Sequence, residues 1–117
     1  MDNTQILEKT IAAFEKNDPS LIPELFAEDG EWQMIGKEIE TVKGRDMQQW
    51  FQQNQGIEMI SSTINHKIIS GNTAAVDGEV VCKGPDGKVS SMFYIDVYDF
   101  ENGKIKLMKS YTSPKEN

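Results

Sequence analysis

The sequence has few of the residues and segments by which many protein classes are identified. Its single cysteine, Cys82, cannot form an internal disulfide, so the fold does not depend on an oxidising compartment. Its single histidine, His66, excludes a metal site built from several histidines. The first residues lack the basic start and apolar stretch of a signal peptide, and no apolar run could span a bilayer. Together these absences predict a cytoplasmic protein.

Several chemical motifs are also missing. Glycine-rich phosphate loops, serine nucleophile elbows, zinc-ligand spacings and EF-hand loops do not occur. We therefore expect no kinase, serine-elbow hydrolase or zinc enzyme, and neither a metal nor a cofactor. Acidic residues outnumber basic ones by 19 to 12, which gives a formal charge of −7. Such a charge repels nucleic acid and anionic membranes, so we expect neither as a partner.

The 117 residues are enough for one hydrophobic core and too few for two. The hydrophobic share of 38% and the charged share of 26% are those of an ordinary globular protein. No internal repeat, linker or low-complexity segment divides the chain. The sequence therefore predicts a single domain over residues 1–117.

The first half of the chain has mainly helical patterns. Apolar residues recur at helical spacing from Thr4 to Lys16, and Asn17-Asp18-Pro19 ends that helix and starts a second one. The second helix is expected to stop near Asp29-Gly30. A short strand is expected over 31–35, and a third helix follows Lys43-Gly44. Its apolar stripe is Met47, Trp50 and Phe51, and it ends by Gly56.

The second half alternates strand-forming runs with strong turn signals. The signals are Gly71-Asn72, Pro85-Asp86-Gly87 and Asn102-Gly103. They predict four consecutive antiparallel strands near 59–70, 73–83, 88–100 and 104–112. No large sheet is expected before residue 57.

The third of these strands is apolar on both faces. Met92, Tyr94 and Tyr98 lie on one side, whereas Phe93, Ile95 and Val97 lie on the other. A sheet with one wet face would alternate apolar with polar residues. We therefore expect one face to cover the helices and a pocket, and the outer face to be covered by a second copy in a homodimer.

Two residues are candidates for chemistry. Asp96 lies in the middle of the third strand and shares the face of Tyr94 and Tyr98, so loss of water should raise its pKa. His66 has an ordinary pKa near neutrality and would serve as a general acid or base if it faced the pocket. Both also have structural interpretations, as a carboxylate bonded to a neighbour and as a surface or packed histidine. Cys82 is expected to fill space within a strand.

Particular segments carry a family resemblance. These are Ile11-Ala12-Ala13-Phe14 with Asn17-Asp18, Leu25-Phe26-Ala27-Glu28-Asp29, Lys43-Gly44-Arg45, and Phe100-Glu101-Asn102-Gly103-Lys104-Ile105. Together they resemble the SnoaL-like branch of the nuclear-transport-factor-2-like superfamily, over nearly the whole chain. The resemblance implies an α+β fold in which a cone-shaped, curved antiparallel sheet packs on three N-terminal helices around one pocket. It also implies a homodimer in many cases.

The resemblance can be tested against ketosteroid isomerase, one activity of that superfamily. Asp96 occupies the place of that enzyme's protonated aspartate, which donates to an oxyanion. The position of its tyrosine partner holds Thr10 here, and the position of its aspartate base holds Met34, with Gln33 beside it. Neither Met34 nor Gln33 can remove a proton from carbon. Steroid isomerisation by the family mechanism is therefore not expected.

Two functions stay open at this point. The first is binding of a small apolar or carbonyl-bearing ligand in the cone pocket, without steroid isomerisation. The alternative is a cofactor-independent isomerase, cyclase or dehydratase that acts on a small carbonyl compound, with Asp96 as oxyanion donor and His66 as acid or base. The residues expected to line the pocket are Phe14, Trp32, Met34, Trp50, Met92, Tyr94, Met108, Ser110 and Thr112.

Overall fold

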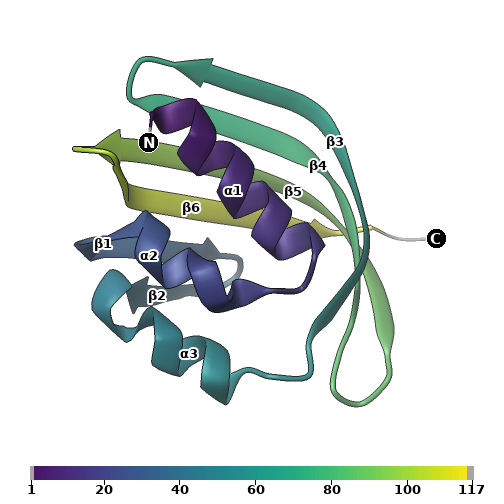
Figure 1. The fold of residues 1–117 in the computed structure, drawn as a ribbon. Helices are drawn as coiled ribbons and strands as arrows, with labels where there is room; N and C mark the ends of the chain where they lie inside the picture. Colours follow the sequence, from purple (N-terminus) through teal and green to yellow (C-terminus); the bar gives the residue numbers. More distant parts are fainter. Residues whose placement is uncertain (1, 116–117) are drawn as a thin grey trace.

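Helices cover one face of a strongly curved six-stranded sheet (Figure 1). The structure is a computed structural model that describes residues 2–115. The sheet has the strand order β2-β1-β6-β5-β4-β3, and α1 lies across its covered face. The α+β cone predicted from the sequence is thereby confirmed.

The first helix, α1 (Asn3–Glu15), forms as its pattern predicts. Asp2 caps it, because its carboxylate accepts from the backbone amide of Gln5 while the Gln5 side chain accepts from the amide of Asp2. Ile6 and Leu7 face the sheet and are buried completely or nearly so. Burial of this apolar stripe against the strands is what holds the helix in place.

The second helix is much shorter than predicted. It consists of the 3₁₀ turn η1 (Pro19–Leu21) and one α-helical turn, α2 (Ile22–Leu25), and the chain is already extended at Phe26. The predicted end near Asp29-Gly30 was therefore wrong. Pro23 in the first turn limits regular helix, and burial of Phe26 in the core favours the extended chain.

The sheet is larger at its N-terminal side than the sequence suggested. The strand β1 (Phe26–Ile35) pairs with β2 (Ile39–Lys43), which the sequence analysis missed, and runs parallel to β6 (Lys104–Pro114). The sheet is consequently mixed rather than wholly antiparallel. β2 gave little signal because it is a short edge strand in which only Val42 is buried.

The backbone before the third helix packs closely against β1. The 3₁₀ turn η2 (Gly44–Asp46) leads into α3 (Met47–Gln53), in which Met47 is fully buried. A Cβ atom at Gly44 would lie 2.1 Å from the carbonyl oxygen of Ala27, so only glycine fits there. This contact fixes where α3 begins.

The four predicted strands of the second half are confirmed with small changes at their ends. They are β3 (Glu58–Ser70), β4 (Thr73–Lys83), β5 (Val89–Glu101) and β6. The β5–β6 turn has positive φ at both Asn102 and Gly103, as a two-residue hairpin of this kind requires. The antiparallel register is regular from β4 to β5, which decides which side chains face the helices.

The strand β3 carries two irregularities. Its register with β4 shifts between Met59 and Ser61, and again between Ile64 and His66. At such a bulge the alternation of side chains between the two faces is interrupted. Residues on either side of a bulge can therefore face opposite sides from those expected by counting.

The helices of the described residues do not cross a membrane, since none is both long and apolar enough. Within residues 2–115 there is also no group of three or more His, Cys, Asp or Glu side chains able to hold a metal ion.

Candidate functional site

Two neighbouring cavities lie between the sheet and the helices. The inner cavity has a volume of about 230 Å³, and the outer cavity has a volume of about 590 Å³. Four residues line both cavities and thus form their common boundary: Phe14, Trp32, Met59 and Cys82. The combined volume of the two cavities is typical of a site for a small molecule.

The inner cavity is built mainly by the central strands. Asp96 of β5 lies between Val76 of β4 and Ser110 of β6 in the sheet register, and all three line the cavity. In the adjacent row Tyr94 lies opposite Thr112, and these two also line it. Because the register is regular here, alternate residues of β5 and β6 point into the same space.

Asp96 is the carboxyl group at the centre of this cavity. Burial raises its pKa from 3.8 to about 6, and a hydrogen bond with Ser110 keeps it from rising further. Burial likewise raises the pKa of the Tyr94 phenol and raises that of Tyr98 well above its ordinary value. At neutral pH these tyrosines are uncharged, and Asp96 is the group of the inner cavity that titrates near that range.

A hydrogen bond from Trp32 determines whether the Ser110 hydroxyl acts as a donor or an acceptor toward Asp96. The indole Nε1 of Trp32 donates to the Ser110 hydroxyl oxygen over 2.9 Å. Since that oxygen already accepts from Trp32, its own proton is available for the Asp96 carboxylate. Ser110 therefore favours the ionised form of Asp96, which is why it lowers the pKa of that group.

Trp32 is also the centre of an aromatic cluster. Its ring centroid lies 5.6 Å from that of Phe14, 5.2 Å from that of Trp50 and 6.0 Å from that of Phe51. These are tilted and edge-on contacts of the favourable kind. Because Trp32 is only 8% exposed, it forms a fixed wall between the two cavities.

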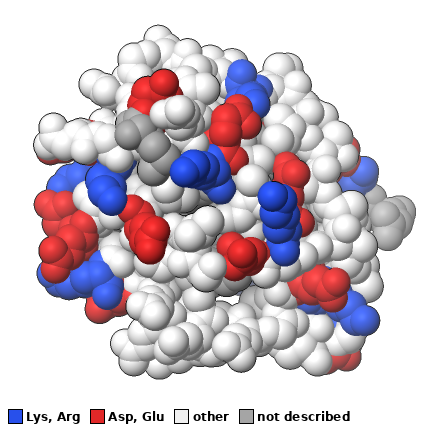
Figure 2. Space-filling view, in the orientation of Figure 1, with Lys and Arg blue, Asp and Glu red and all other residues white. Residues whose placement is uncertain are grey.

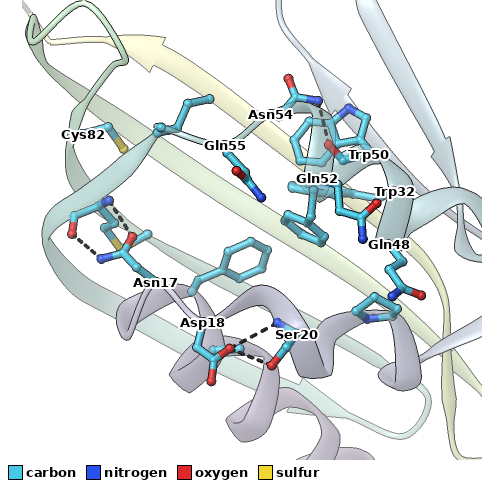
Figure 3. A pocket seen from close by; sticks show the side chains of 17 residues that line it. Asn17, Asp18, Ser20, Trp32, Gln48, Trp50, Gln52, Asn54, Gln55 and Cys82 are labelled. Atoms are coloured by element: carbon cyan, nitrogen blue, oxygen red, sulfur yellow. Dashed lines mark hydrogen bonds between the residues drawn. The ribbon is translucent and has the colours of Figure 1, made fainter.

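The outer cavity is built from α3 and from the segments on either side of it. Figure 3 shows side chains of α3, of the 54–57 segment and of the chain after α1 arranged around one open space. Aromatic groups of Trp50 and Phe51 form part of its wall. Polar groups surround it, and many of them are side-chain amides: Asn17, Gln48, Gln52, Asn54 and Gln55.

These polar groups divide into two sets. Asn17 exchanges two hydrogen bonds with the backbone of Met59, at 2.8 and 3.0 Å, and Asn54 donates to the carbonyl of Trp50 over 2.8 Å. Asp18 accepts from Ser20, and this bond lowers the pKa of its carboxyl. By contrast, the side chains of Gln48, Gln52 and Gln55 make no hydrogen bond with any residue in the part of the chain that the structure describes (Figure 3).

The cavities have no cationic lining. Among the described residues that line them there is no lysine, arginine or histidine, whereas Glu15, Asp18 and Asp96 are carboxylic acids. Figure 2 shows that the surface over α3, beside a hollow in this face, consists of uncharged side chains. An anionic ligand would therefore meet no cationic side chain among these lining residues.

Most of the residues expected in the pocket do line a cavity. Trp50 lines the outer cavity, and Phe14 and Trp32 line both. Four more of the expected residues line the inner cavity together with Asp96: Tyr94, Met108, Ser110 and Thr112.

Met34 and Met92 were also expected in the pocket, but they line neither of the two cavities. Met34 packs against the hydrophobic core. Met92 shares the face of Tyr94 but pairs with Pro114 near the end of the sheet, beyond the cavity. Counting residues along a strand gives the face but not the position along the cone.

His66 does not join Asp96. Its side chain is 72% exposed, and its Nδ1 lies 2.8 Å from a carboxylate oxygen of Asp77. The bulge between Ile64 and His66 places His66 opposite Asp77, which pairs with Ile95 on the outer face of the sheet. In this conformation His66 cannot exchange a proton with a ligand in either cavity.

Thr10, at the position of the isomerase's tyrosine, is fully buried, and its hydroxyl donates to the carbonyl of Ile6 over 2.8 Å. It lines neither cavity and offers no proton to a ligand there.

The sequence analysis missed the amide groups of the outer cavity. A signal was present, because α3 contains four glutamines in seven residues and no charged residue. Glutamine is common on exposed helix faces, so this composition alone did not indicate a site.

Comparisons with known proteins agree with this architecture. The sequence profile of the SnoaL-like domain matches residues 7–108. A nuclear-transport-factor-2-like protein of unknown function from Burkholderia pseudomallei superposes with a TM-score of 0.79 at 22% identity, over 97% of this chain and 92% of that one. No curated protein sequence matches the chain.

Two further solved structures have the same fold. A protein from Mesorhizobium loti, provisionally described as a SnoaL-like polyketide cyclase, has a TM-score of 0.73 and 17% identity, over 95% of this chain and 99% of that one. An epoxide hydrolase of the LEH-like type from M. tuberculosis has a TM-score of 0.77 and 14% identity, over 93% and 80%. At such identities these likenesses show the fold alone. Since the SnoaL-like profile covers most of the chain, the protein belongs to the SnoaL-like family, with a nuclear-transport-factor-2-like fold.

Proposed function

We propose that the protein binds a small, largely apolar molecule that carries a carbonyl or hydroxyl oxygen, and that Asp96 contacts that oxygen in the inner cavity. The observation that supports this most directly is that Asp96, with a pKa of about 6, lies among the central strands of a cavity whose lining is mainly apolar. One polar group that fixes orientation within an apolar lining is typical of small-molecule sites.

The protonation state of Asp96 makes this proposal specific. With a pKa of about 6, roughly one carboxyl in ten is protonated at pH 7. A carbonyl ligand needs the protonated form, because that form alone donates a hydrogen bond. A hydroxyl ligand is bound better by the ionised form, which is the stronger acceptor. The two ligand types should therefore respond to pH in opposite directions.

Calorimetric titration with two fused-ring probes tests this proposal. We expect 1-tetralone, a ketone, to bind about tenfold more tightly at pH 5 than at pH 8, since a hydrogen bond to Asp96 is gained. We expect 2-naphthol to show the reverse trend. Asp96→Asn should remove both trends. The matched control is Asp99→Asn, because Asp99 is on the same strand but lines neither cavity.

The proposal fails if neither probe binds. It also fails if the pH trends survive in Asp96→Asn, because the titrating group would then be another one. Loss of both trends in Asp99→Asn as well would assign them to a change of the strand as a whole.

Catalysis is a second candidate, and the same carboxyl group favours it. A protonated Asp96 can donate to an oxyanion that develops on a carbonyl compound, as an isomerase, cyclase or dehydratase requires. Because His66 is exposed to solvent, the reaction would need another base. Glu15 is the other carboxylic acid that lines the inner cavity. Exchange of the α-protons of 1-tetralone in D₂O, followed by NMR, measures this activity. Exchange no faster than in Asp96→Asn protein would exclude it for this ketone.

We further propose that the protein forms a homodimer through the outer face of the sheet. Phe93, Ile95 and Tyr111 are 47%, 41% and 38% exposed on that face. Lys115 lies over the Phe93 ring and is paired with Glu79, so the charges beside this apolar surface are balanced. An identical face is therefore not repelled there, and it would cover apolar surface that is otherwise exposed.

Light scattering after size-exclusion chromatography tests the dimer. We expect twice the 13.2 kDa mass of one chain, and the single-chain mass for Ile95→Lys. Leu21→Lys is the control, since Leu21 is 52% exposed in η1 and not on the sheet. A wild-type protein of single-chain mass would contradict the proposal.

A further inference from the structure

We propose that the outer cavity is a second subsite for the same ligand and that it takes an uncharged, hydroxyl-rich part such as a sugar ring or a polyol. This inference rests on the proposed function, because the apolar, oxygen-bearing part of the ligand would occupy the inner cavity. The ligand would then have two parts of different chemistry, each matched by one cavity.

The two cavities adjoin each other, and a molecule that spans both would pass the residues that they share. Phe14, Trp32, Met59 and Cys82 line both spaces, so no further layer of protein separates them. Burial raises the pKa of the Cys82 thiol, so this boundary carries no charge near neutral pH. A ligand that passes along it meets apolar and aromatic surface only.

The outer cavity offers hydrogen-bonding groups that the fold itself does not use. Asn17, Asp18 and Asn54 are occupied by partners within the protein. Gln48 and Gln52, one helical turn apart on α3, have no such partner among residues 2–115. Figure 3 shows that these two glutamines and Gln55 surround the open space. Their amides are thus available to a ligand.

The chemistry of the amide group identifies the ligand class. A glutamine side chain donates two hydrogen bonds and accepts at its oxygen, so it matches a hydroxyl group, which also does both. It carries no charge and so does not select for an ionised ligand. A carboxylate or phosphate would instead meet Asp18 without any cation among the residues that line the outer cavity. The site therefore favours neutral hydroxyl groups.

The aromatic wall completes the match. The rings of Trp50 and Phe51 lie edge to face, with centroids 5.1 Å apart, and both line the outer cavity. The Trp50 indole is held from outside by a 3.3 Å hydrogen bond to Glu40 of β2. A pyranose ring has C–H faces that need apolar cover and a rim of hydroxyls that need polar partners. Rigid rings beside free amides supply both.

Three related probes measure this directly by calorimetry at pH 7. The first is 2,6-dihydroxynaphthalene, which extends no polar group into the outer cavity. The second is 6-hydroxy-2-naphthyl β-D-glucoside, which adds a neutral sugar, and the third is the corresponding glucuronide, which adds a carboxylate. We expect the glucoside to bind about tenfold more tightly than 2,6-dihydroxynaphthalene, which corresponds to one or two additional hydrogen bonds. We expect the glucuronide to lose that advantage.

The helix provides its own matched control. The variant Gln48→Met/Gln52→Met removes the two amides that line the cavity but keeps the length of each side chain. In this variant the glucoside should bind no better than 2,6-dihydroxynaphthalene. In Gln49→Met/Gln53→Met two exposed glutamines of the same helix, which line neither cavity, are changed instead. This variant should keep the tenfold advantage. Asp96→Asn should weaken all three probes by the same factor.

The outcomes separate the two proposals. If 2,6-dihydroxynaphthalene binds in an Asp96-dependent manner but the glucoside gains nothing, the outer subsite is wrong and the proposed function stands. The subsite is also wrong if the advantage survives in Gln48→Met/Gln52→Met. If the advantage depends on those glutamines but Asp96→Asn weakens none of the three probes, the subsite stands and the role of Asp96 is wrong. If no probe binds, both proposals are wrong.

Discussion

The inner and outer cavities differ in the structure that forms their walls. The inner cavity lies over long strands in regular register, where Asp96 is fixed between Val76 and Ser110. The outer cavity depends on the seven-residue helix α3 and on loop segments such as 54–57. Side chains on paired strands are held by neighbours on both sides, whereas those on a short helix are held mainly by the face that it buries.

This difference indicates a division of roles. The rigid inner cavity carries Asp96, whose charge depends on pH near neutrality, and a fixed surrounding is what keeps such a pKa shifted. The outer cavity carries uncharged amides on exposed positions, which can adjust to a variable group. Substitutions should therefore act on orientation and ionisation in the inner cavity, and on affinity for an appended group in the outer one.

The largest effect is expected for Trp32→Ala, because Trp32 forms the wall between the cavities. The change removes a ring that is only 8% exposed and its hydrogen bond to Ser110, and should lower the free energy of unfolding by about 3 to 5 kcal/mol. Urea denaturation measures this. A loss below about 1 kcal/mol would show that the wall is not structural and that the comparison between two separate cavities is wrong.

Asn17→Ala should have the next largest effect. Asn17 has a φ of 53° and joins the chain after α1 to Met59 by two hydrogen bonds. Loss of those bonds and the strain of alanine at positive φ should together cost about 2 kcal/mol in the free energy of unfolding. Asn17→Gly loses the same bonds without the strain and should cost roughly half as much.

Hydrogen exchange locates this effect. In Asn17→Ala the amide of Met59 should exchange faster, because it donates to the Asn17 side chain in the wild-type protein. The amides of β5 around Asp96 should be unchanged. Faster exchange in both regions would show that the cavities open together and would remove the distinction between a rigid and an adjustable part.

The pH dependence of stability tests the inner cavity alone. The pKa of Asp96 is raised in the folded state, to about 6, so the folded protein binds more protons than the unfolded chain between pH 4 and 6. The contribution of Asp96 is therefore most favourable below its unfolded pKa of 3.8, and is lost as the pH rises through about 6. Asp96→Asn should consequently be more stable than wild type at pH 7 and show no such gain at pH 4.

The expected gain at pH 7 is about 1 to 2 kcal/mol, less than the full shift would give, because the side chain keeps some contact with solvent in the cavity. Thermal unfolding of Asp96→Asn and Asp99→Asn at both pH values measures it. If Asp96→Asn is less stable at pH 7, the hydrogen bond with Ser110 outweighs the desolvation of the charge.

The same division explains what could be predicted from the sequence. Tyr94, Asp96 and Ser110 were placed in the pocket by alternation along β5 and β6, which holds because those strands lack bulges in this region. The orientation of His66 stayed open in the sequence, because the bulge after Ile64 that turns it to the outer face has no strong sequence signal. Alternation is informative only where the register is unbroken.

The remaining errors concern short elements. α2 and β2 have four and five residues, so neither contains enough turns or alternations for a periodic pattern to be read. The amide lining of the outer cavity was missed for a related reason. Which glutamines of α3 face the cavity depends on how that helix sits on Trp32, and this contact is tertiary.

The smallest change in stability is expected for Trp50→Phe. Trp50 is half-buried and makes one 3.3 Å hydrogen bond to Glu40, so the free energy of unfolding should change by less than about 0.5 kcal/mol. The variant is useful because the chain has two tryptophans, and Trp32 is then the single one left. Trp32→Phe conversely leaves Trp50 as the reporter of the outer cavity.

Acrylamide quenching of these two variants compares the cavities without any ligand. Fluorescence from Trp32 should be weakly quenched in Trp50→Phe, because its ring is only 8% exposed and still packs against Phe14, Phe51 and the ring that replaces Trp50. Fluorescence from Trp50 should be quenched more strongly, since it borders the open cavity. Equal quenching would mean that solvent reaches the wall from both sides. The inner cavity would then not be dry enough to hold the pKa of Asp96 near 6, and the opposite pH trends expected for ketone and phenol probes would disappear with it.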